Sequence, residues 1–578
     1  MGGARIAAAR YHGKPKEEKG TVPICAKHPS GRSGKWGLSP FLPQVGNLTH
    51  DSHAYRANTM LSTLYRPPLG LLTDLYQLTM ACAYFRAGVQ DREGVFHLSF
   101  RHNPFGGGFT IAAGLATAVD YLENLRFDPA DLDYLASLEG NDHQPLLDRA
   151  FLDVLGRLTL QCDLDAMPEG TVVFPHEPLL RVRGPLWQAQ LLETALLCIV
   201  NFQTLIATKA ARVTLAAQGE PVLEFGLRRA QGIDGALSAS RAAYIGGCAA
   251  TSNVLAGRLL GIPVKGTHAH SWVMCFDDEP AAFRAYAAAM PNNCVFLVDT
   301  YDTLQGVRNA IEAGRWLRAQ GHEMIGIRLD SGDLAYLSSA ARRMLDEAGF
   351  PNAAVLASND LDEHLIAGLK QQGATIGVWG VGTRLVTAFN QPAIDGVYKL
   401  SAIREPGGAW QDCLKLSEHA GKMSDPGILQ VRRFVADGRA MADAIFDERH
   451  EPEGDCTIVD PDDATRRKHI AAGRETGTGS AAVRTDKGRN QSAAVPVPVS
   501  SAQSEDLLVP VFRGGRRVYD VPPLTESRER TQRQLALFHA GIKRFVNPHE
   551  YPAGLEERLH ERKLSLIRRA RRQENSTP

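Results

Sequence analysis

Short runs of consecutive apolar residues alternate with longer amphipathic stretches through the middle of the chain. The runs lie at 221–225, 262–264, 295–298, 324–327, 354–356 and 376–379. Stretches with the apolar spacing of helices lie between them, at 238–260, 303–320, 333–349 and 361–372. Because the two patterns alternate about every 30 residues, as in βαβ units, this region is predicted to form a parallel sheet covered on both faces.

Polar residues follow each predicted strand. In strand order they are Arg228 and Arg229; His268 and His270; Asp299 and Asp302; Arg328, Asp330 and Asp333; Ser358, Asn359 and Asp360; and Gly380, Gly382 and Thr383. In parallel α/β folds the carboxyl ends of the strands line the active site. A polar residue there can also cap the following helix. Capping explains one such residue well, but it explains a set of arginines, histidines and carboxylates poorly.

The patterns outside this region predict further domains. Alternating strand patterns at 94–101, 171–174 and 179–182, with helical patterns between 110 and 160, indicate an α+β domain ahead of the parallel sheet. Strand patterns at 396–400 and 413–418 are expected to return to that domain, and a final helix is expected near 524–537. We expect an α+β domain of 61–185 with 392–447, a catalytic α/β domain of 186–391, a linker of 448–505, and a C-terminal segment of 506–578 that packs on the core.

Two segments lack the composition of a packed core. Residues 1–60 are rich in Gly, Pro, Lys, Arg and His without periodicity, and we expect a disordered extension, with Met60 as a second candidate start. Residues 465–503 have few bulky apolar side chains, so the linker is expected to contain a disordered insertion. The basic run at 568–572 is interpreted as a solvated surface.

Composition excludes several classes of protein. With 64 basic and 64 acidic residues the formal net charge is zero, so nothing attracts the whole chain to nucleic acid or a membrane surface. The nine cysteines are scattered without a Cys-x-x-Cys pair, which indicates neither a disulfide framework nor a zinc site. The longest apolar stretch, 191–207, includes Glu193, Asn201 and Gln203, and is expected to be a core helix rather than a membrane span.

A set of local motifs resembles the nicotinate phosphoribosyltransferases, a family of type II phosphoribosyltransferases. The resemblance covers about 69–447 and 506–566. It rests on the order and spacing of LLTDLYQLTM, FRHNPFGGG, EFGLRRAQGIDG, GTHAHS, VDTYDT, IRLDSGDL, GVGT, FNQPAIDGVYKL, LLVPVFRGGRRVY and VNPHEYP. It implies an α/β fold with an irregular α/β barrel, an α+β open-faced sandwich domain and a C-terminal extension.

The resemblance also implies a reaction of pyridine nucleotide salvage toward NAD. Nicotinate and phosphoribosyl pyrophosphate would give nicotinate mononucleotide and pyrophosphate, with Mg²⁺ as cofactor. ATP would be a co-substrate, hydrolysed through a phosphohistidine, which places the enzyme in the ligase class. It further implies a cytoplasmic homodimer with shared active sites, and no nucleic-acid or membrane partner.

A flat pyridine carboxylate needs aromatic faces to stack on and a cation to pair with. Phe225 and Tyr76 match the family's stacking rings, with Tyr76 reaching across the dimer interface. Arg328 matches the arginine that pairs with the carboxylate, and Arg228 and Thr267 are assigned to the same substrate site. Each residue also has an ordinary structural interpretation: Phe225 and Tyr76 as packed rings, and Arg228 as a surface arginine.

The transition state should resemble an oxocarbenium ion, which carboxylates stabilise. Asp299 and Asp330 are the candidate catalytic residues, and they are also the candidate Mg²⁺ ligands through pyrophosphate or water. Both could instead be helix caps. Gly380, Gly382 and Thr383 form a turn whose amides are suited to the 5′-phosphate, although glycine turns are common at strand ends.

His270 matches the family's phosphorylated histidine, and imidazole is nucleophilic and partly neutral near pH 7. His268 lies two residues earlier, where the family more often has an apolar residue. Strand alternation would place both rings on one side.

Three alternatives stay open at this stage. They are a related phosphoribosyltransferase acting on nicotinamide or quinolinate, a catalytically silent nucleotide-binding protein on the same fold, and an unrelated α/β-barrel lyase. A lyase of this kind would need a Schiff-base lysine, for which Lys265 is the nearest candidate.

Overall fold

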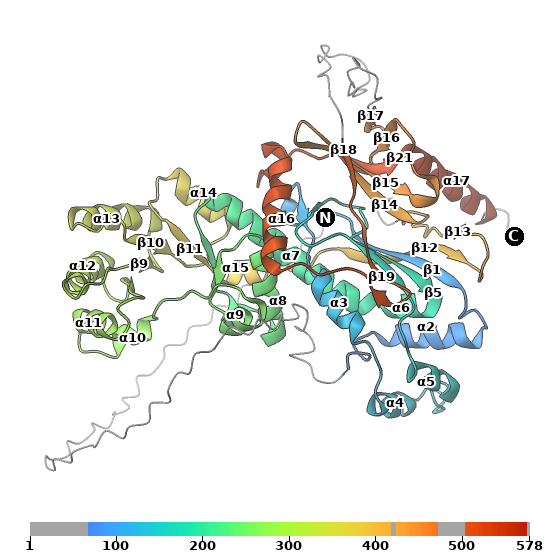
Figure 1. The fold of residues 1–578 in the computed structure, drawn as a ribbon, viewed down its shortest axis with the longest axis horizontal. Helices are drawn as coiled ribbons and strands as arrows, with labels where there is room; N and C mark the ends of the chain where they lie inside the picture. The colour runs from blue at the N-terminus through green and yellow to red at the C-terminus, as the bar shows by residue number, and fades with distance from the viewer. Residues whose placement is uncertain (1–67, 418–422, 472–502, 575–578) are drawn as a thin grey trace, which may run out of the picture. The chain divides into compact units, whose positions relative to one another are not determined.

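The computed structural model describes residues 68–417, 423–471 and 503–574, which form a mixed α/β structure (Figure 1). The predicted N-terminal extension, 1–60, and most of the predicted insertion, 472–502, lie outside the described residues. The fold is organised by three sheets and a two-stranded ribbon made of β2 (Thr110–Ile111) and β4 (Val172–Val173).

The first sheet is antiparallel and belongs to the predicted α+β domain. In spatial order its strands are β13 (Gln411–Asp412), β12 (Gly396–Arg404), β1 (Glu93–Phe100), β5 (Leu180–Pro185), β3 (Asp163–Ala166), β19 (Val509–Arg513) and β20 (Arg516–Arg517). Strand β12 returns to pair with β1 as predicted, with Gly396 opposite Phe100. The second expected strand is wrong in its described part, because 413–417 is irregular and pairing with β12 ends at β13.

The second sheet is parallel and confirms the alternating pattern of the sequence. In spatial order its strands are β7 (Ala250–Thr251), β6 (Val222–Glu224), β11 (Val378–Val381), β10 (Ala354–Ala357), β9 (Gly326–Leu329) and β8 (Val295–Leu297). Helices α12 (Thr303–Ala319), α13 (Leu334–Glu347) and α14 (Glu363–Gln371) connect its strands (Figure 1). Strands β7 and β8 are its edges, so the expected irregular barrel takes the form of a half-barrel.

The segment between β6 and β8 differs from the prediction. The single helix expected at 238–260 is two helices, α8 (Gly232–Ile245) and α9 (Val254–Leu260), separated by β7. Gly247 has φ +115°, a conformation that glycine adopts readily, and this turn lets the chain enter the sheet. The strand expected at 262–264 is reduced to a single bridge between Val264 and Thr251.

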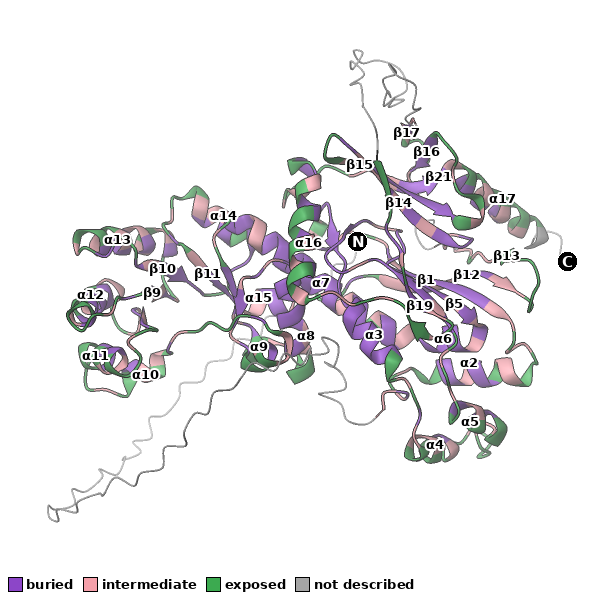
Figure 2. Cartoon of the chain, viewed as in Figure 1, coloured by how far each residue is buried: buried purple, intermediate pink, exposed green. Residues whose placement is uncertain are grey.

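Helix α7 (Glu193–Ala217) is the only helix in the described ranges that is long and apolar enough to cross a membrane. Most of its residues are buried (Figure 2), including 72% of its most apolar window, as in the core helix of a globular protein. It packs against α8, α14 and β2, and therefore lies between the half-barrel and the two-stranded ribbon. The prediction of a core helix in this region is confirmed.

The third sheet gathers strands from the last third of the chain. In spatial order they are β17 (Arg467–Ile470), β16 (Cys456–Val459), β21 (Ala553–Glu556), β15 (Arg439–Asp447), β14 (Leu429–Ala436) and β18 (Gln503–Asp506). The described parts of the predicted linker therefore contain strands β16, β17 and β18, and 429–447 does not join the first sheet. Helix α17 (Glu557–Glu574), which carries the basic run, packs on β16 and β21 (Figure 1).

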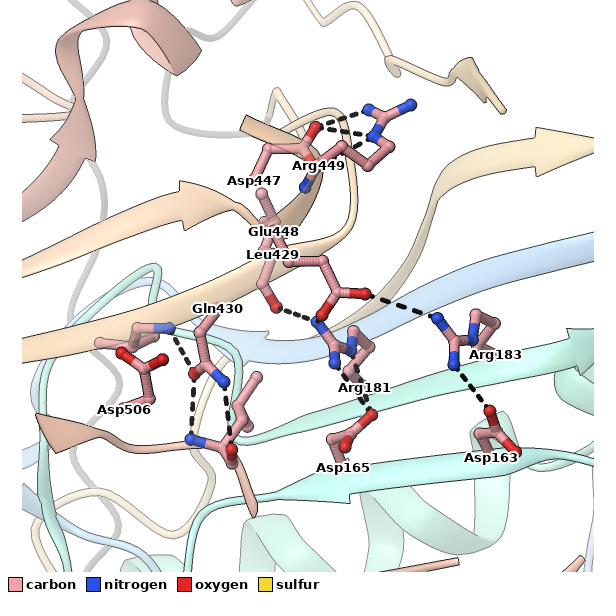
Figure 3. Close-up of polar contacts among 12 residues, drawn as sticks. Asp163, Asp165, Arg181, Arg183, Leu429, Gln430, Asp447, Glu448, Arg449 and Asp506 are labelled. Carbon is pink, nitrogen blue, oxygen red and sulfur yellow. Dashed lines mark hydrogen bonds and ion pairs between the residues drawn. The ribbon is translucent and has the colours of Figure 1, made fainter. Parts of the chain in front are cut away.

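Arginines of β5 connect the first and third sheets (Figure 3). Arg181 Nη1 donates to the carbonyl of Leu429 over 3.0 Å and lies 2.7 Å from Glu448 Oε2, while its Nη2 lies 3.0 Å from Asp165. Arg183, two residues further along β5, also forms an ion pair with Glu448. A guanidinium has five donors, so one side chain can bridge two layers.

The remaining helices complete the layers, and α16 has the bounds that the sequence predicted. They are α2 (Leu75–Arg86), α3 (Leu115–Glu123), α4 (Pro129–Ala136), α5 (Arg149–Leu155), α6 (Leu186–Leu191), α10 (His270–Met274), α11 (Glu279–Ala289), α15 (Thr383–Val386) and α16 (Leu524–Leu537), with 3-10 turns η1 (Pro104–Gly106), η2 (Leu227–Arg229), η4 (Glu448–His450) and η5 (Ala540–Lys543).

Candidate active site

His270 lies at the carboxyl edge of the half-barrel, facing two carboxylates. It is the first residue of α10, and its Nδ1 is hydrogen bonded to Thr300 Oγ1 at 3.1 Å. Its Nε2 lies 4.0 Å from Asp299 Oδ1 and 3.8 Å from Asp330 Oδ2. The imidazole therefore has one nitrogen fixed by a hydroxyl and the other directed toward negative charge.

Asp299 and Asp330 follow the neighbouring strands β8 and β9. Asp299 Oδ2 accepts hydrogen bonds from the Asp330 amide at 3.0 Å and from Ser331 Oγ at 2.6 Å. These bonds fix the two carboxylates relative to each other. Burial raises the pKa of Asp330, but hydrogen bonds from Ser358 and Arg328 and the charge of His270 bring it below its ordinary value. Asp330 is therefore held as an anion.

Arg328, on β9, connects three parts of this edge. Its Nε donates to Ser358 Oγ at 2.8 Å, Nη1 to Thr267 Oγ1 at 3.0 Å and Nη2 to Asp330 Oδ1 at 2.8 Å. Its guanidinium carbon lies 5.8 Å from the centre of the Phe225 ring. Because arginine has five N–H donors, its terminal nitrogens keep donors for a ligand.

Phe225 stands at the end of β6 against a glycine of β11. Its amide donates to Val381 O at 2.8 Å. A Cβ on Gly380 would lie 2.8 Å from the Phe225 ring, so glycine is required there for the ring to pack. Gly382 precedes α15, and a Cβ on it would meet the backbone of Phe225 at 3.3 Å. The aromatic ring and the glycine turn thus form one wall of the edge.

In the described part of the chain, two predicted substrate residues, Arg228 and Tyr76, make no hydrogen bond, ion pair or ring contact with this set. Arg228 lies in the exposed turn η2, two residues after Gly226. Tyr76 lies on α2 in the first region of the chain, half exposed, where burial and then the nearby charge of Glu193 raise its pKa. The polar groups around Tyr76 therefore come from α2 with its N-cap and from the start of α7, and none comes from the carboxyl edge of the half-barrel.

His268 does not share the orientation of His270, so the expectation from strand alternation is wrong. Its Nε2 accepts a hydrogen bond from the Leu297 amide at 3.2 Å, and its ring lies 4.9 Å from Tyr286 and 6.0 Å from Phe283. The segment at 265–269 forms no strand, and His270 begins a helix. His268 is an aromatic core residue whose pKa is lowered by burial.

The sequence analysis assigned no role to several residues that position the site. Ser358 was among the strand-end residues after β10 but was not proposed for the site, and Thr300 follows β8, where the strand-end rule that selected Asp299 points to it as well. Glu224 is buried at the end of β6, where its carboxylate accepts hydrogen bonds from the Gly226 amide, Ser240 and Thr251. Those three bonds hold the turn that carries Phe225 and Arg228.

Asp299 and Asp330 are also the candidate ligands for the expected Mg²⁺ ion. Asp299 Oδ1 is buried and has no hydrogen-bond partner among the described residues, which leaves it open as a ligand. No group of three or more His, Cys, Asp or Glu residues suited to a metal occurs in the described parts of the chain. Two carboxylate side chains with substrate phosphates and water are a common arrangement for Mg²⁺, so these residues fit the ion.

Lys265 does not provide the lyase chemistry considered above. Its side chain is exposed, and its backbone amide donates to Thr251 O at the sheet edge. The eight described cysteines are free thiols, in keeping with the scattered pattern of the sequence.

Family models match two separate parts of the chain. The model of the nicotinate phosphoribosyltransferase (NAPRTase) N-terminal domain matches residues 71–201, and the model of the C-terminal domain of the same family matches 489–563. The two matches flank the half-barrel.

Relatives match over most of their length. Nicotinate phosphoribosyltransferase of Bacillus subtilis (strain 168) is 43% identical over 500 residues, which cover 86% of this chain and 95% of the relative. The human nicotinate phosphoribosyltransferase is 36% identical over 547 residues, covering 85% of this chain and 95% of the relative.

Solved structures agree with these matches. The crystal structure of human nicotinic acid phosphoribosyltransferase superposes with a TM-score of 0.71 at 32% identity, covering 86% of this chain and 99% of that chain. Nicotinate-nucleotide pyrophosphorylase from Pyrococcus furiosus shares the fold, with a TM-score of 0.58 at 21% identity over 81% of this chain and 96% of that chain. This chain belongs to the nicotinate phosphoribosyltransferase family.

Proposed function

We propose that the carboxyl edge of the half-barrel joins nicotinate to phosphoribosyl pyrophosphate, giving nicotinate mononucleotide and pyrophosphate. The observation that carries the proposal is the position of Arg328. Its guanidinium lies between the Phe225 ring and the carboxylate of Asp330, which in turn faces His270. The cation and the flat apolar face suit an aromatic acid, and the carboxylate suits the positive charge that develops on the sugar with which this acid reacts.

Nicotinate binding is assigned to Phe225, Arg328, Arg228 and Thr267. The pyridine ring would stack on Phe225, and its carboxylate would accept hydrogen bonds from the remaining donors of Arg328. Thr267, whose hydroxyl accepts from Arg328 and donates to the His268 carbonyl, would hold this arginine in place. Arg228 lies on the exposed turn beside Phe225, where it can approach a ligand without losing a partner in the described residues. This arrangement favours an acid over nicotinamide, since an amide gains no ion pair.

Glycosyl transfer is assigned to the carboxylates. The ring nitrogen forms a bond to C1 of the ribose while the bond from C1 to the pyrophosphate oxygen breaks, and its electrons leave with pyrophosphate. Asp299 and Asp330 would stabilise the positive charge on the sugar and hold its hydroxyls. Both would also hold Mg²⁺, which when bound neutralises charge on the departing pyrophosphate.

The phosphate end of the substrate is assigned to Gly380, Gly382 and Thr383. This turn runs from the end of β11 to the beginning of α15, against the backbone of Phe225. Backbone amides that are free of bulky side chains suit a 5′-phosphate.

His270 is proposed as the acceptor of a phosphoryl group from ATP. One ring nitrogen is hydrogen bonded to Thr300 and the other faces Asp299 and Asp330. In such a step the imidazole nitrogen bonds to the γ-phosphorus, ADP leaves, and water later hydrolyses the phosphohistidine. The ordered imidazole and its carboxylate neighbours support this role.

A homodimer with shared sites is proposed from exposed apolar residues. Leu72, Leu75 and Tyr76 are exposed in and just before α2, and Leu227, Ile233 and Val254 are exposed around the edge of the half-barrel that carries Arg228. Tyr76 of a second copy would supply the other stacking face for nicotinate. We also expect the enzyme to act in the cytoplasm.

Pyrophosphate release with nicotinate, nicotinamide or quinolinate as the acceptor tests the proposal. Nicotinate should be used with the highest kcat/KM. Turnover of nicotinamide in preference to nicotinate would overturn the assignment of Arg328 as the carboxylate partner. His270→Ala should lose phosphoryl labelling from ATP, and a labelled His270→Ala variant would exclude the histidine step.

A further inference from the structure

Three charged side chains are fully buried between α7 and α14. Lys209 Nζ lies 2.6 Å from Glu363 Oε2, and Arg212 Nε donates to Glu363 Oε1 at 2.8 Å. Lys209 and Glu363 are 0% exposed as whole residues, and so is Arg212. We name Lys209, Arg212 and Glu363 the buried charge cluster.

Burying the charge cluster costs free energy, because its charged groups lose their hydration. The cluster holds two cations against one carboxylate, and the terminal nitrogens of Arg212 are buried without a hydrogen-bond partner in the described residues. The rings of Phe105 and Phe545 lie 5.8 Å and 5.2 Å from its guanidinium carbon and offset part of this cost. Because apolar residues of similar volume often stabilise a core equally well, stability alone does not explain the cluster.

Contacts of the cluster lead to the segment that follows the glycine turn. Lys209 Nζ donates to Asn390 Oδ1 at 3.2 Å. Asp362, next to Glu363, lies 2.5 Å from Arg384 Nη1. Arg384 directly follows Thr383, so ion pairs and hydrogen bonds hold both ends of the 384–390 segment.

Gln391, the residue that follows this segment, is tied to the loop after β1. The Phe105 amide donates to Gln391 Oε1 at 2.8 Å. Phe105 has φ +61°, which is uncommon for a residue other than glycine. A Cβ on Gly107 would lie 2.7 Å from Arg212 Nη1, so the backbone of this loop packs directly against the guanidinium of the cluster. Backbone in such a conformation is held in place by its surroundings.

We propose that the buried charge cluster, acting through Asn390 and Asp362, positions the turn 380–383 for the phosphate of the sugar substrate. The cluster residues are positioning residues that touch no substrate. The inference rests on the proposed phosphate role of Gly380, Gly382 and Thr383, and adds the elements that fix this turn: α7, α14 and the loop 103–107.

Two substitutions test the proposal without removing a cluster residue. Asn390→Ala removes the acceptor of Lys209. Asp362→Asn keeps a good helix cap for α14 but places an amide NH₂ against the Arg384 guanidinium. The KM for phosphoribosyl pyrophosphate should rise about 5-fold in the first variant and about 10-fold in the second. The KM for nicotinate should stay unchanged in both, and Asn390→Asp should restore the wild-type value.

Asp443→Asn is a matched control, because it weakens a buried Arg–Asp pair in the third sheet. It should lower the melting temperature and leave both KM values unchanged. If Asp362→Asn and Asn390→Ala behave like this control, or raise both KM values in parallel, the cluster is only structural and the proposal is overturned.

Thr383→Ala distinguishes failure of the inference from failure of the proposed phosphate site. A raised KM for phosphoribosyl pyrophosphate in Thr383→Ala, with no change in the other two variants, overturns the positioning role alone. An unchanged KM in Thr383→Ala overturns the phosphate assignment, and the positioning role with it.

Discussion

Two arginine–aspartate pairs in different sheets show how one interaction serves two purposes. Arg328 and Asp330 lie 2.8 Å apart at the edge of the half-barrel, with side chains 13% and 31% exposed. Arg433 and Asp443 lie 2.5 Å apart between β14 and β15, with both side chains fully buried. The pairs have the same chemistry and differ in their surroundings.

The buried pair has its polar groups occupied by protein. Arg433 Nη1 donates to Gln534 and Nη2 to the carbonyl of Val172, while the Tyr551 hydroxyl donates to Asp443. The pair at the half-barrel edge instead contacts hydroxyls and an imidazole, and keeps arginine donors open. A pair that is saturated by protein stabilises the fold, whereas one with free donors beside solvent is available to a ligand.

The largest expected effect is on stability at the buried pair. Asp443→Asn leaves Arg433 buried without its counter-ion, which should lower the free energy of unfolding by about 3–5 kcal/mol. Urea unfolding followed by circular dichroism measures the loss. A decrease below about 1 kcal/mol would show that this pair contributes no more to the free energy of unfolding than a surface ion pair does.

A substitution in the Arg328–Asp330 pair should lower the rate of catalysis. Asp330→Asn removes a carboxylate that faces His270, and we expect kcat to fall roughly 10²–10³-fold, as for a group that stabilises transition-state charge. Steady-state kinetics give the loss, and urea unfolding of the same variant should show little change because Asp330 is partly exposed. A large loss of stability with nearly normal kcat would show that the Arg328–Asp330 pair is structural rather than catalytic.

Arg328→Lys should have a smaller effect that is specific to the acid substrate. Lysine keeps the charge but loses the planar fork, so the KM for nicotinate should rise about 10-fold. The substrate dependence of initial rates provides the measurement. An equal rise in the KM for phosphoribosyl pyrophosphate would mean that Arg328 serves the whole site rather than the nicotinate carboxylate.

A further effect depends on pH and concerns His97, a buried histidine of β1 in the first sheet. Burial, and then the charge of Arg181, lowers the pKa of His97 to about 3. Its Nε2 accepts a hydrogen bond from the Leu429 amide at 3.1 Å, which requires the neutral ring. Protonation therefore favours the unfolded chain. The contribution of His97 is complete above the unfolded pKa near 6.5 and decreases by up to about 1.4 kcal/mol per pH unit as the pH falls toward 3.

Urea unfolding between pH 7.5 and 5 measures this dependence. His97→Gln can still accept the hydrogen bond and should reduce the slope. An unchanged slope in His97→Gln would assign the acid sensitivity to other groups.

The strand ends were predictable because their chemistry follows a simple periodicity. Each apolar run ends in a polar group, and parallel strands bring these groups to one edge, which was enough to place Asp299, Arg328 and Asp330 together. The orientation of His268 was not predictable, since it depends on where α10 begins and on rings from α11. Strand β7 was missed because a short buried strand after a Gly-Gly pair resembles a continued small-residue helix.

The third sheet was not predicted because its strands are brought together by pairing between distant segments. Alternation is visible in 429–436 and 439–447, but no local pattern indicates that β16, β17 and β18 join them. Ionic contacts in the cluster of Lys209, Arg212 and Glu363 were hidden for the same reason, because α7 and α14 are far apart in the chain.

Strand β21 has a central place in the third sheet, parallel to β15 on one side and antiparallel to β16 on the other. It contributes residues 553–556, so the ribosome must release most of the chain before the sheet can be completed. Until then, the inner edges of β15 and β16 stay unpaired and open to other extended polypeptides. Assembly of this sheet is therefore a late event in folding, in which chaperones that shield unpaired strands should improve the yield.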